Sequence, residues 1–229
     1  MAEYLYETHL HTLPVSKCAT ASVRENLEFY KSIGYAGVFV TNHFLNGNIN
    51  CDPTLPYEER LDFYFSDYEE ALEIGKEIGI DVFFGIESSY KGTDFLVYGL
   101  DKEFFLAHHE IEELKTTDML TLMAEHGALI IQAHPYREAS YINHIRLFPR
   151  HVHGVETYNA GREDFTNEMA EIYAKAYGLS PFSGSDNHKA SAAKNLGGMS
   201  SDTPIKDEYD FIERVRNGEM KLVKIKRDI

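Results

Sequence analysis

Histidines and carboxylates occur in this sequence at the positions that a metal site would need. His9 and His11 are one residue apart at the end of a short strand-like run, Tyr4 to Thr12. Residues i and i+2 of a strand point to the same face, so the two imidazoles would lie side by side, as two ligands of one metal ion require. The spacing alone is equally consistent with two half-exposed strand histidines.

Further residues of the types that ligate metals each follow a separate apolar run. They are His43, Glu87, His134, Glu156, Asp186 and His188. Short apolar runs of this kind are typical of buried strands. The chain therefore delivers histidine or carboxylate to the end of one predicted strand after another, which favours a shared cluster over isolated surface histidines.

The elements that must position these residues alternate between apolar strands and amphipathic helices. Strands are predicted at 4–11, 36–41, 81–87, 94–98, 128–133, 152–158, 181–185 and 220–226. Helical spacing predicts helices over 21–33, 64–78, 117–126, 165–177 and 207–217. The polar stretch 44–60 is longer than an ordinary connection and is predicted to be a lid or binding loop.

This alternation predicts an α/β fold with a largely parallel sheet. Seven or eight strands in this length suit a barrel better than an open sheet. In such barrels the carboxyl ends of the strands form the active-site face. That geometry would bring all eight histidines and carboxylates into one pocket.

Length and charge limit the possible functions. The 229 residues are predicted to form a single domain over 1–229, and 22 basic against 37 acidic residues give a net charge of −15. That charge disfavours a stable nucleic-acid partner or an anionic membrane surface. Cys18 and Cys51 do not suggest a disulfide framework or a zinc ribbon. With neither a signal sequence nor a membrane span evident, we expect a cytoplasmic protein.

Six motifs together resemble the polymerase and histidinol phosphatase (PHP) superfamily. They are His-Leu-His at 9–11, Thr-Asn-His at 41–43, Gly-Ile-Glu at 85–87, Ala-His-Pro at 133–135, Val-Glu-Thr-Tyr-Asn at 155–159 and Gly-Ser-Asp-Asn-His at 184–188. They run in the family's order across nearly the whole chain. The resemblance implies a distorted, TIM-like (β/α)7 barrel that holds two or three divalent metal ions and hydrolyses phosphate esters.

The resemblance also implies a role for each motif residue. The first metal would be held by His9, His11, Glu87 and Asp186, the second by Glu87 and His134, and the third by His43 and His188. Family members usually give the second metal another histidine, where this chain has Asp94. Asp101 is the alternative for that role, and an aspartate is an adequate oxygen ligand. Glu156 and Asn159 would support the ligands rather than bind metal.

The first loop departs from the family. An Asp or His often lies five or six residues after the second histidine, where this chain has Ser16 and Lys17. A protonated ammonium cannot bind a metal. Either the third ion is held weakly or the enzyme is binuclear. Lys17 could instead neutralise a phosphate oxygen, or be a solvated loop lysine.

The predicted chemistry is hydrolysis of a small-molecule phosphomonoester, as in histidinol phosphatases. Two or three ions, of Zn, Mn or Fe, would lower the pKa of a bridging water and neutralise charge on the phosphate. Asp186 would take part as a ligand, Arg137 and Arg162 could grip phosphate oxygens, and His188 or a metal-bound water could protonate the leaving alcohol. The alternatives are a phosphodiesterase or exonuclease on short nucleotides, a tyrosine phosphatase, and a non-catalytic metal-binding module. The oligomeric state stays open.

Overall fold

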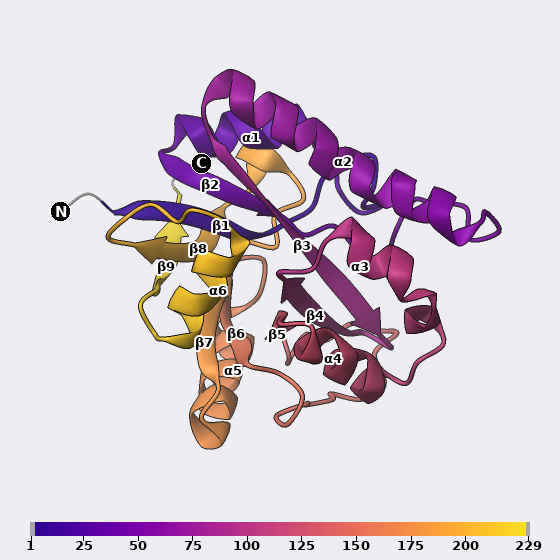
Figure 1. Ribbon diagram of the computed structural model, residues 1–229. Helices are drawn as coiled ribbons and strands as arrows, with labels where there is room; N and C mark the ends of the chain where they lie inside the picture. The colour runs from indigo at the N-terminus through magenta and orange to yellow at the C-terminus, as the bar shows by residue number, and fades with distance from the viewer. Residues whose placement is uncertain (1–2, 228–229) are drawn as a thin grey trace.

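A single curved sheet forms the centre of the protein (Figure 1). The structure is a computed structural model that describes residues 3–227, and these contain nine strands. The strands are β1 (Tyr4–Leu10), β2 (Tyr35–Val40), β3 (Asp81–Tyr90), β4 (Thr93–Tyr98), β5 (Leu129–Ala133), β6 (Gly154–Asn159), β7 (Ser180–Gly184), β8 (Asn195–Ser201) and β9 (Lys221–Lys226). Their order across the sheet is β7-β6-β5-β4-β3-β2-β1-β8-β9.

Strand direction matches the prediction for most of the sheet. The pairs β1–β2, β2–β3, β5–β6 and β6–β7 are parallel, whereas β3–β4, β4–β5, β1–β8 and β8–β9 are antiparallel. Only β4 and β8 therefore run against the other seven strands, so the sheet is largely parallel, as predicted. The β3–β4 reversal has a local cause, because Lys91 and Gly92 both have positive φ and form a two-residue hairpin turn.

The two ends of the sheet approach each other and nearly close a barrel. The Ser183 hydroxyl of β7 donates a hydrogen bond to the carbonyl of Val223 in β9 at 2.7 Å. On β8, the Gly197 N–H donates to Ser185 Oγ at 2.7 Å. A Cβ on Gly197 would lie 2.3 Å from the Gly184 carbonyl oxygen, so only glycine permits this approach. The predicted α/β barrel is confirmed.

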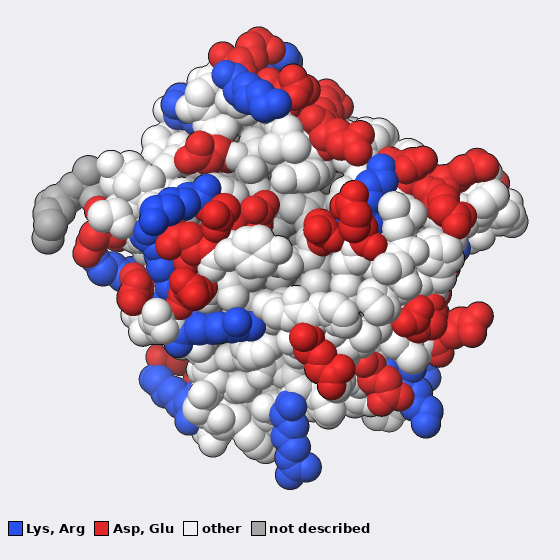
Figure 2. All heavy atoms as spheres, viewed as in Figure 1, with Lys and Arg blue, Asp and Glu red and all other residues white. Residues whose placement is uncertain are grey.

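Helices cover the outside of the barrel and one of its ends. They are α1 (Val23–Ser32), α2 (Tyr57–Ile78), α3 (Lys102–Ala107), α4 (Thr116–Glu125), α5 (Asp164–Tyr177) and α6 (Glu208–Arg216). Phe211 of α6 packs on Phe39 of β2 with ring centroids 4.4 Å apart. On the face shown in Figure 2, acidic side chains gather along α2 with Lys and Arg among them.

Two predicted boundaries need correction, and two elements were not predicted. α2 begins at Tyr57 rather than at 64, because Glu58 and Glu59 in the first turn favour the helix N-terminus. The predicted 44–60 loop is therefore shortened to 44–56. Strand β8 was not predicted, since its two glycines and lack of β-branched residues hide its strand character. The short helix α3 was also not predicted.

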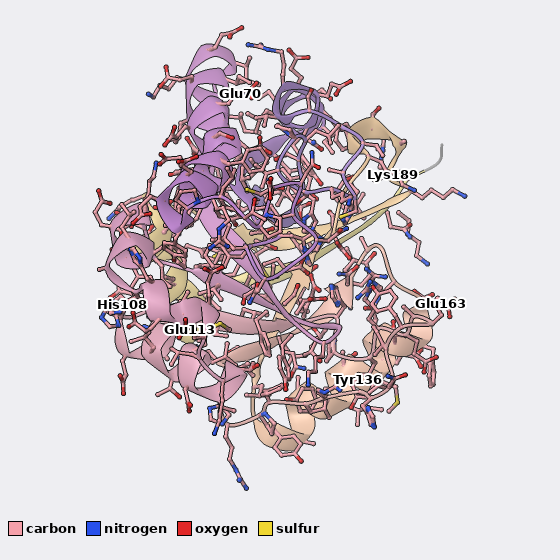
Figure 3. All side chains as sticks on the ribbon, turned by 90° about the vertical axis from the view of Figure 1, so that its right-hand side faces the viewer. Glu70, His108, Glu113, Tyr136, Glu163 and Lys189 are labelled. Atoms are coloured by element: carbon pink, nitrogen blue, oxygen red, sulfur yellow. The ribbon has the colours of Figure 1, made fainter. Side chains whose placement is uncertain are left out.

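The loops that follow β5, β6 and β7 emerge on the same side of the molecule. Tyr136, Glu163 and Lys189, one from each of these loops, lie on one side of the view in Figure 3, and His108 and Glu113 lie on the other. No helix within residues 3–227 combines the length and the apolar character that crossing a bilayer requires.

Candidate metal centre

Five strands deliver these predicted ligands to one end of the barrel. His9 and His11 come from the end of β1, His43 follows β2, and Glu87 lies in β3. His134 follows β5, and both Asp186 and His188 follow β7. The structure thus brings together the motif residues as the rule for the carboxyl ends of barrel strands predicts.

Glu87 lies at the centre of the cluster. Its Oε1 is 3.2 Å from His9 Nε2 and 3.2 Å from His134 Nε2. Its Oε2 is 2.6 Å from His43 Nδ1 and 3.4 Å from His11 Nε2. One carboxylate therefore faces four imidazoles, with each oxygen turned to a different pair. This is the arrangement of a carboxylate that bridges two cations.

Asp186 faces the same imidazoles from the other side. Its Oδ1 is 3.6 Å from His9 Nε2 and 3.5 Å from His11 Nε2. Three sets of donor atoms each lie within 4.8 Å of one another: those of His9, His11 and Asp186, of His9, Glu87 and His134, and of His11, His43 and His188.

Unpartnered buried atoms indicate that these residues fit metal ions. Nε2 of His9, Nε2 of His11, Nδ1 of His43 and Oε2 of Glu87 are buried and make no hydrogen bond of acceptable geometry among the described residues, although His43 Nδ1 and Glu87 Oε2 are only 2.6 Å apart. Such atoms are costly unless something satisfies them. They converge on one another, and nitrogen and carboxylate oxygen are the donors that zinc, manganese and iron accept.

For two of the clustered residues, neighbouring charges shift the pKa in the direction opposite to burial. Burial would raise the pKa of Glu87, but His43 and His9 outweigh it and hold that pKa well below its usual value. Burial would lower the pKa of His43, and the Glu87 carboxylate instead raises it to about 10. His11 differs, because burial and the nearby His188 and His43 lower its pKa well below the usual value.

Glu156 and Asn159 support the ligands from behind. Glu156 Oε1 is 2.9 Å from His9 Nδ1, and its Oε2 accepts a hydrogen bond from the His134 backbone N–H at 2.9 Å. Asn159 Nδ2 donates to the same Oε2 at 2.8 Å. A partner on the second imidazole nitrogen fixes the orientation of a ligating histidine. Glu156 is fully buried and holds two predicted ligands at once.

The structure distinguishes the two aspartates that were candidates to replace the family's usual second-metal histidine. Asp94 is the second residue of β4, whose reversed direction brings it opposite Ala133, and its Oδ2 lies 3.9 Å from His134 Nε2. Asp101 instead caps α3 by accepting a hydrogen bond from the Phe104 N–H at 2.8 Å. Asp94 therefore lies in the cluster and Asp101 outside it.

A cavity of about 690 Å³ opens onto the cluster. Two of the three basic side chains predicted to bind the substrate phosphate, Arg137 and Arg162, line this cavity. Arg137 Nη1 is 3.6 Å from Asp94 Oδ2, and Arg162 Nη2 is 2.6 Å from Asp186 Oδ2. Both arginines line the cavity, whereas Lys17 is exposed and is not among its lining residues.

Sequence reasoning did not identify Cys18 as part of the site. Its Sγ lies 3.2 Å from His43 Nε2, and it lines the same cavity. Burial would raise its pKa, but His188 and His43 outweigh burial and lower the pKa to about 6. A signal was present, because Cys18 directly follows Lys17 in the loop where the family places another ligand.

Comparisons with known proteins relate the chain to others by structure alone. No protein-family model matches the sequence, and no curated protein matches it. A two-domain protein from Bacteroides vulgatus containing a predicted PHP-like metal-dependent phosphoesterase has a TM-score of 0.67 at 12% identity. The match covers 97% of this chain and 65% of that protein, so the chain spans less than two thirds of its length.

Two further solved structures share the fold. A proposed metal-dependent phosphoesterase from Bifidobacterium adolescentis has a TM-score of 0.55 at 14% identity, over 91% of this chain and 94% of that one. The lesion-specific endonuclease of Pyrococcus furiosus has a TM-score of 0.58 at 12% identity, over 99% of this chain and 60% of that one. The chain has the nearly closed barrel of PHP-like structures, as the motifs predicted.

Proposed function

We propose that the protein is a metal-dependent phosphoesterase of PHP type, and that its substrate is a small-molecule phosphomonoester. The central observation is the position of Glu87 between His9, His134, His11 and His43, with each of its oxygens facing two imidazoles. These residues with Asp186 would hold two divalent ions, and the metal can be Zn, Mn or Fe. When bound, such ions activate water as a nucleophile and offset charge on the phosphoryl group.

The arginines would bind the substrate phosphate. Arg162 lines the cavity and contacts Asp186 through Nη2, and its Nε is buried without a hydrogen-bond partner in residues 3–227. Arg137 borders the cavity beside Asp94. A guanidinium presents paired donors that match phosphate geometry, and two of them would orient the phosphoryl group for attack.

His188 is held in a defined orientation beside the cavity. Its Nδ1 donates to the Asp186 carbonyl oxygen at 2.8 Å, which leaves Nε2 as the nitrogen that can act. Nε2 would either give a proton to the leaving alcohol or bind a metal ion. In the second case a water would protonate the alcohol.

A phosphodiester of a short nucleotide is the second candidate. A neighbouring cavity of about 570 Å³ shares Arg137 and Arg162 with the metal cavity and is lined beyond them by Tyr136, Phe165 and Met169. An apolar group on the far side of the phosphate could occupy it. The aromatic lining suits a base or an aryl group, since both stack on aromatic side chains.

Hydrolysis assays with Glu87→Gln test the proposal. The protein is purified without chelator, its metal content measured, and p-nitrophenyl phosphate compared with bis-p-nitrophenyl phosphate under added Zn, Mn and Fe. We expect at least about a 100-fold loss of turnover in Glu87→Gln, since a central metal ligand matters more than a supporting residue. Glu125→Gln, at an exposed site on α4, serves as the control.

The two esters separate the candidates. Faster turnover of the monoester supports the phosphatase, and faster turnover of the diester supports the second candidate. Bound metal without turnover of either ester under any ion, or equal rates for Glu87→Gln and the wild type, would contradict the enzymatic proposal and favour a metal-binding module.

A further inference from the structure

The third group of donor atoms lacks the Asp or His that the family often places in the first loop, where this chain has Ser16 and Lys17. His11, His43 and His188 place their donor atoms within 4.8 Å of one another. His11 Nε2 also lies 3.4 Å from Glu87 and 3.5 Å from Asp186, which commits it to the first metal position. His43 and His188 alone would hold a third ion weakly.

The thiol of Cys18 occupies the side of this group that faces away from Glu87. His43 Nδ1 is turned to Glu87 Oε2, and its other nitrogen, Nε2, lies 3.2 Å from Cys18 Sγ. The backbone two residues after Cys18 is hydrogen-bonded to His188: the Thr20 N–H donates to the His188 carbonyl oxygen at 2.7 Å. Cys18, His43 and His188 all line the same cavity.

The backbone on both sides of Cys18 is fixed. The Lys17 N–H donates to the Asn48 carbonyl oxygen at 3.0 Å, and the Ala19 N–H donates to the Ser16 carbonyl oxygen at 3.1 Å. Ser16 is itself held by a 2.7 Å hydrogen bond from its hydroxyl to Asn42 Oδ1. Because these bonds determine the path of the loop, residue 18 points to the cluster while Lys17 is exposed.

We propose that Cys18 is a thiolate ligand which completes a third metal site with His43 and His188. This inference rests on the proposed function, because it assumes that the neighbouring positions hold metal. Zinc bound tetrahedrally by a sulfur and an imidazole nitrogen keeps these atoms about 3.6 Å apart. The observed 3.2 Å therefore needs to widen by only a few tenths of an ångström.

The ligand set predicts which ion this site selects. One thiolate and two imidazoles favour zinc or ferrous iron over manganese or magnesium, which prefer oxygen. Three protein ligands leave a fourth position open, as in catalytic zinc sites. With His188 Nε2 bound to metal, His188 would not be the proton donor to the leaving alcohol.

Cobalt(II) substitution tests the thiolate directly, without measuring turnover. A thiolate bound to cobalt gives an intense near-ultraviolet charge-transfer absorption that imidazole and carboxylate ligands do not give. We expect this absorption in the wild-type protein titrated with cobalt, its loss in Cys18→Ser, and its retention in Cys51→Ser. Cys51 is the matched control, since its thiol donates a hydrogen bond to the neighbouring Asp52 carbonyl and does not line the metal cavity. Cobalt affinity of the third site should fall by about 10- to 100-fold or more in Cys18→Ser.

Alkylation of the wild-type protein provides a second test that needs no variant. Zinc should protect Cys18 from iodoacetamide while manganese does not, and Cys51 should react equally in both, as measured by mass spectrometry. Absence of the charge-transfer band from cobalt-saturated wild type, or alkylation of Cys18 at an unchanged rate with zinc, would overturn the proposal and leave a thiol–imidazole hydrogen bond. Neither readout depends on hydrolysis, so failure of the thiolate site is distinguishable from failure of the phosphoesterase proposal.

Discussion

Glu156 is a buried carboxylate that contacts two predicted ligands, His9 through Oε1 and the His134 backbone through Oε2. We expect Glu156→Gln to weaken metal binding by about 10- to 100-fold, because an amide cannot hold both contacts with its two different atoms. A competition titration against a zinc indicator measures the change. Glu163→Gln, exposed on the same face of the protein, is the control. Equal affinities of Glu156→Gln and the wild type would show that this contact does not position the ligands.

The sequence was sufficient to predict which residues cluster at the strand ends. It was not sufficient to predict the features that depend on the direction of β4 or on the path of the first loop. The His9–His11 spacing and the apolar runs before His43 and His134 were sufficient to place these residues at one end of the barrel. The choice between Asp94 and Asp101 was not predictable, because it depends on β4 running against its neighbours. For a similar reason, the sequence did not show that Cys18 rather than Lys17 lines the cavity. The loop path depends on Asn48, a residue distant in sequence.

At the scale of elements, Asp67 of α2 connects the loops that follow β1 and β2. Its Oδ2 accepts hydrogen bonds from Thr12 Oγ1 at 2.7 Å, from the Val15 N–H at 3.2 Å and from Asn42 Nδ2 at 3.1 Å. We expect Asp67→Ala to lower the free energy of unfolding by about 1–3 kcal/mol, since it leaves buried donors unpartnered. It should also weaken metal binding, because both loops carry ligands.

Urea denaturation and metal titration of Asp67→Ala test this connection. Asp62→Ala is a suitable control, because Asp62 belongs to the same helix and, within residues 3–227, its side chain forms only an exposed ion pair with Lys102. If the two variants were equally stable and bound metal equally well, α2 would have no role in positioning the ligand loops.

His153 makes the junction of β5 and β6 sensitive to pH. Its Nδ1 accepts a hydrogen bond from the Ile130 N–H at 3.0 Å, and burial, with a smaller effect of Arg216, lowers its pKa. The unfolded chain therefore takes up the proton first, near pH 6.5, and the stability present above that pH is lost as the pH falls. Asn can accept the same bond without titrating. Between pH 7 and pH 5 the free energy of unfolding of the wild type should fall relative to that of His153→Asn. The fall should be less than about 1 kcal/mol, since the half-buried ring is partly screened by solvent.

Urea unfolding of the metal-free proteins at both pH values measures this difference. His144→Asn, in an exposed loop, controls for loss of a histidine and should follow the wild type. A difference between wild type and His153→Asn that does not change with pH would exclude His153 as the cause.

Periodicity predicted most elements of the barrel, and the exceptions have physical reasons. The start of α2 at Tyr57 is favoured by acidic residues in the first turn, a local signal that apolar spacing does not register. β8 is a strand because both of its neighbours supply hydrogen bonds to its glycine-rich backbone. Such tertiary pairing overrides weak strand propensity and cannot be predicted from one segment.

For the whole molecule, metal ions are expected to contribute to stability as well as to chemistry. Two divalent ions would offset four of the fifteen excess negative charges and would satisfy donor atoms that are buried without partners. A ligand that binds the folded state at 100 times its Kd stabilises it by about 2.7 kcal/mol. In a domain of this size each kcal/mol corresponds to about 2–4 °C, so removing metal with a chelator should lower Tm by about 5–10 °C.

Circular dichroism is the suitable probe for this experiment, because the chain has no tryptophan. Melting curves are compared before and after dialysis against a chelator, and again after zinc or manganese is returned. Glu87→Gln is the control, since without its central carboxylate it should melt at the same temperature in all three states. If the wild type also melted at one temperature throughout, the buried histidines and carboxylates would form a self-sufficient polar cluster, and the metal centre would have to be abandoned along with the phosphoesterase proposal.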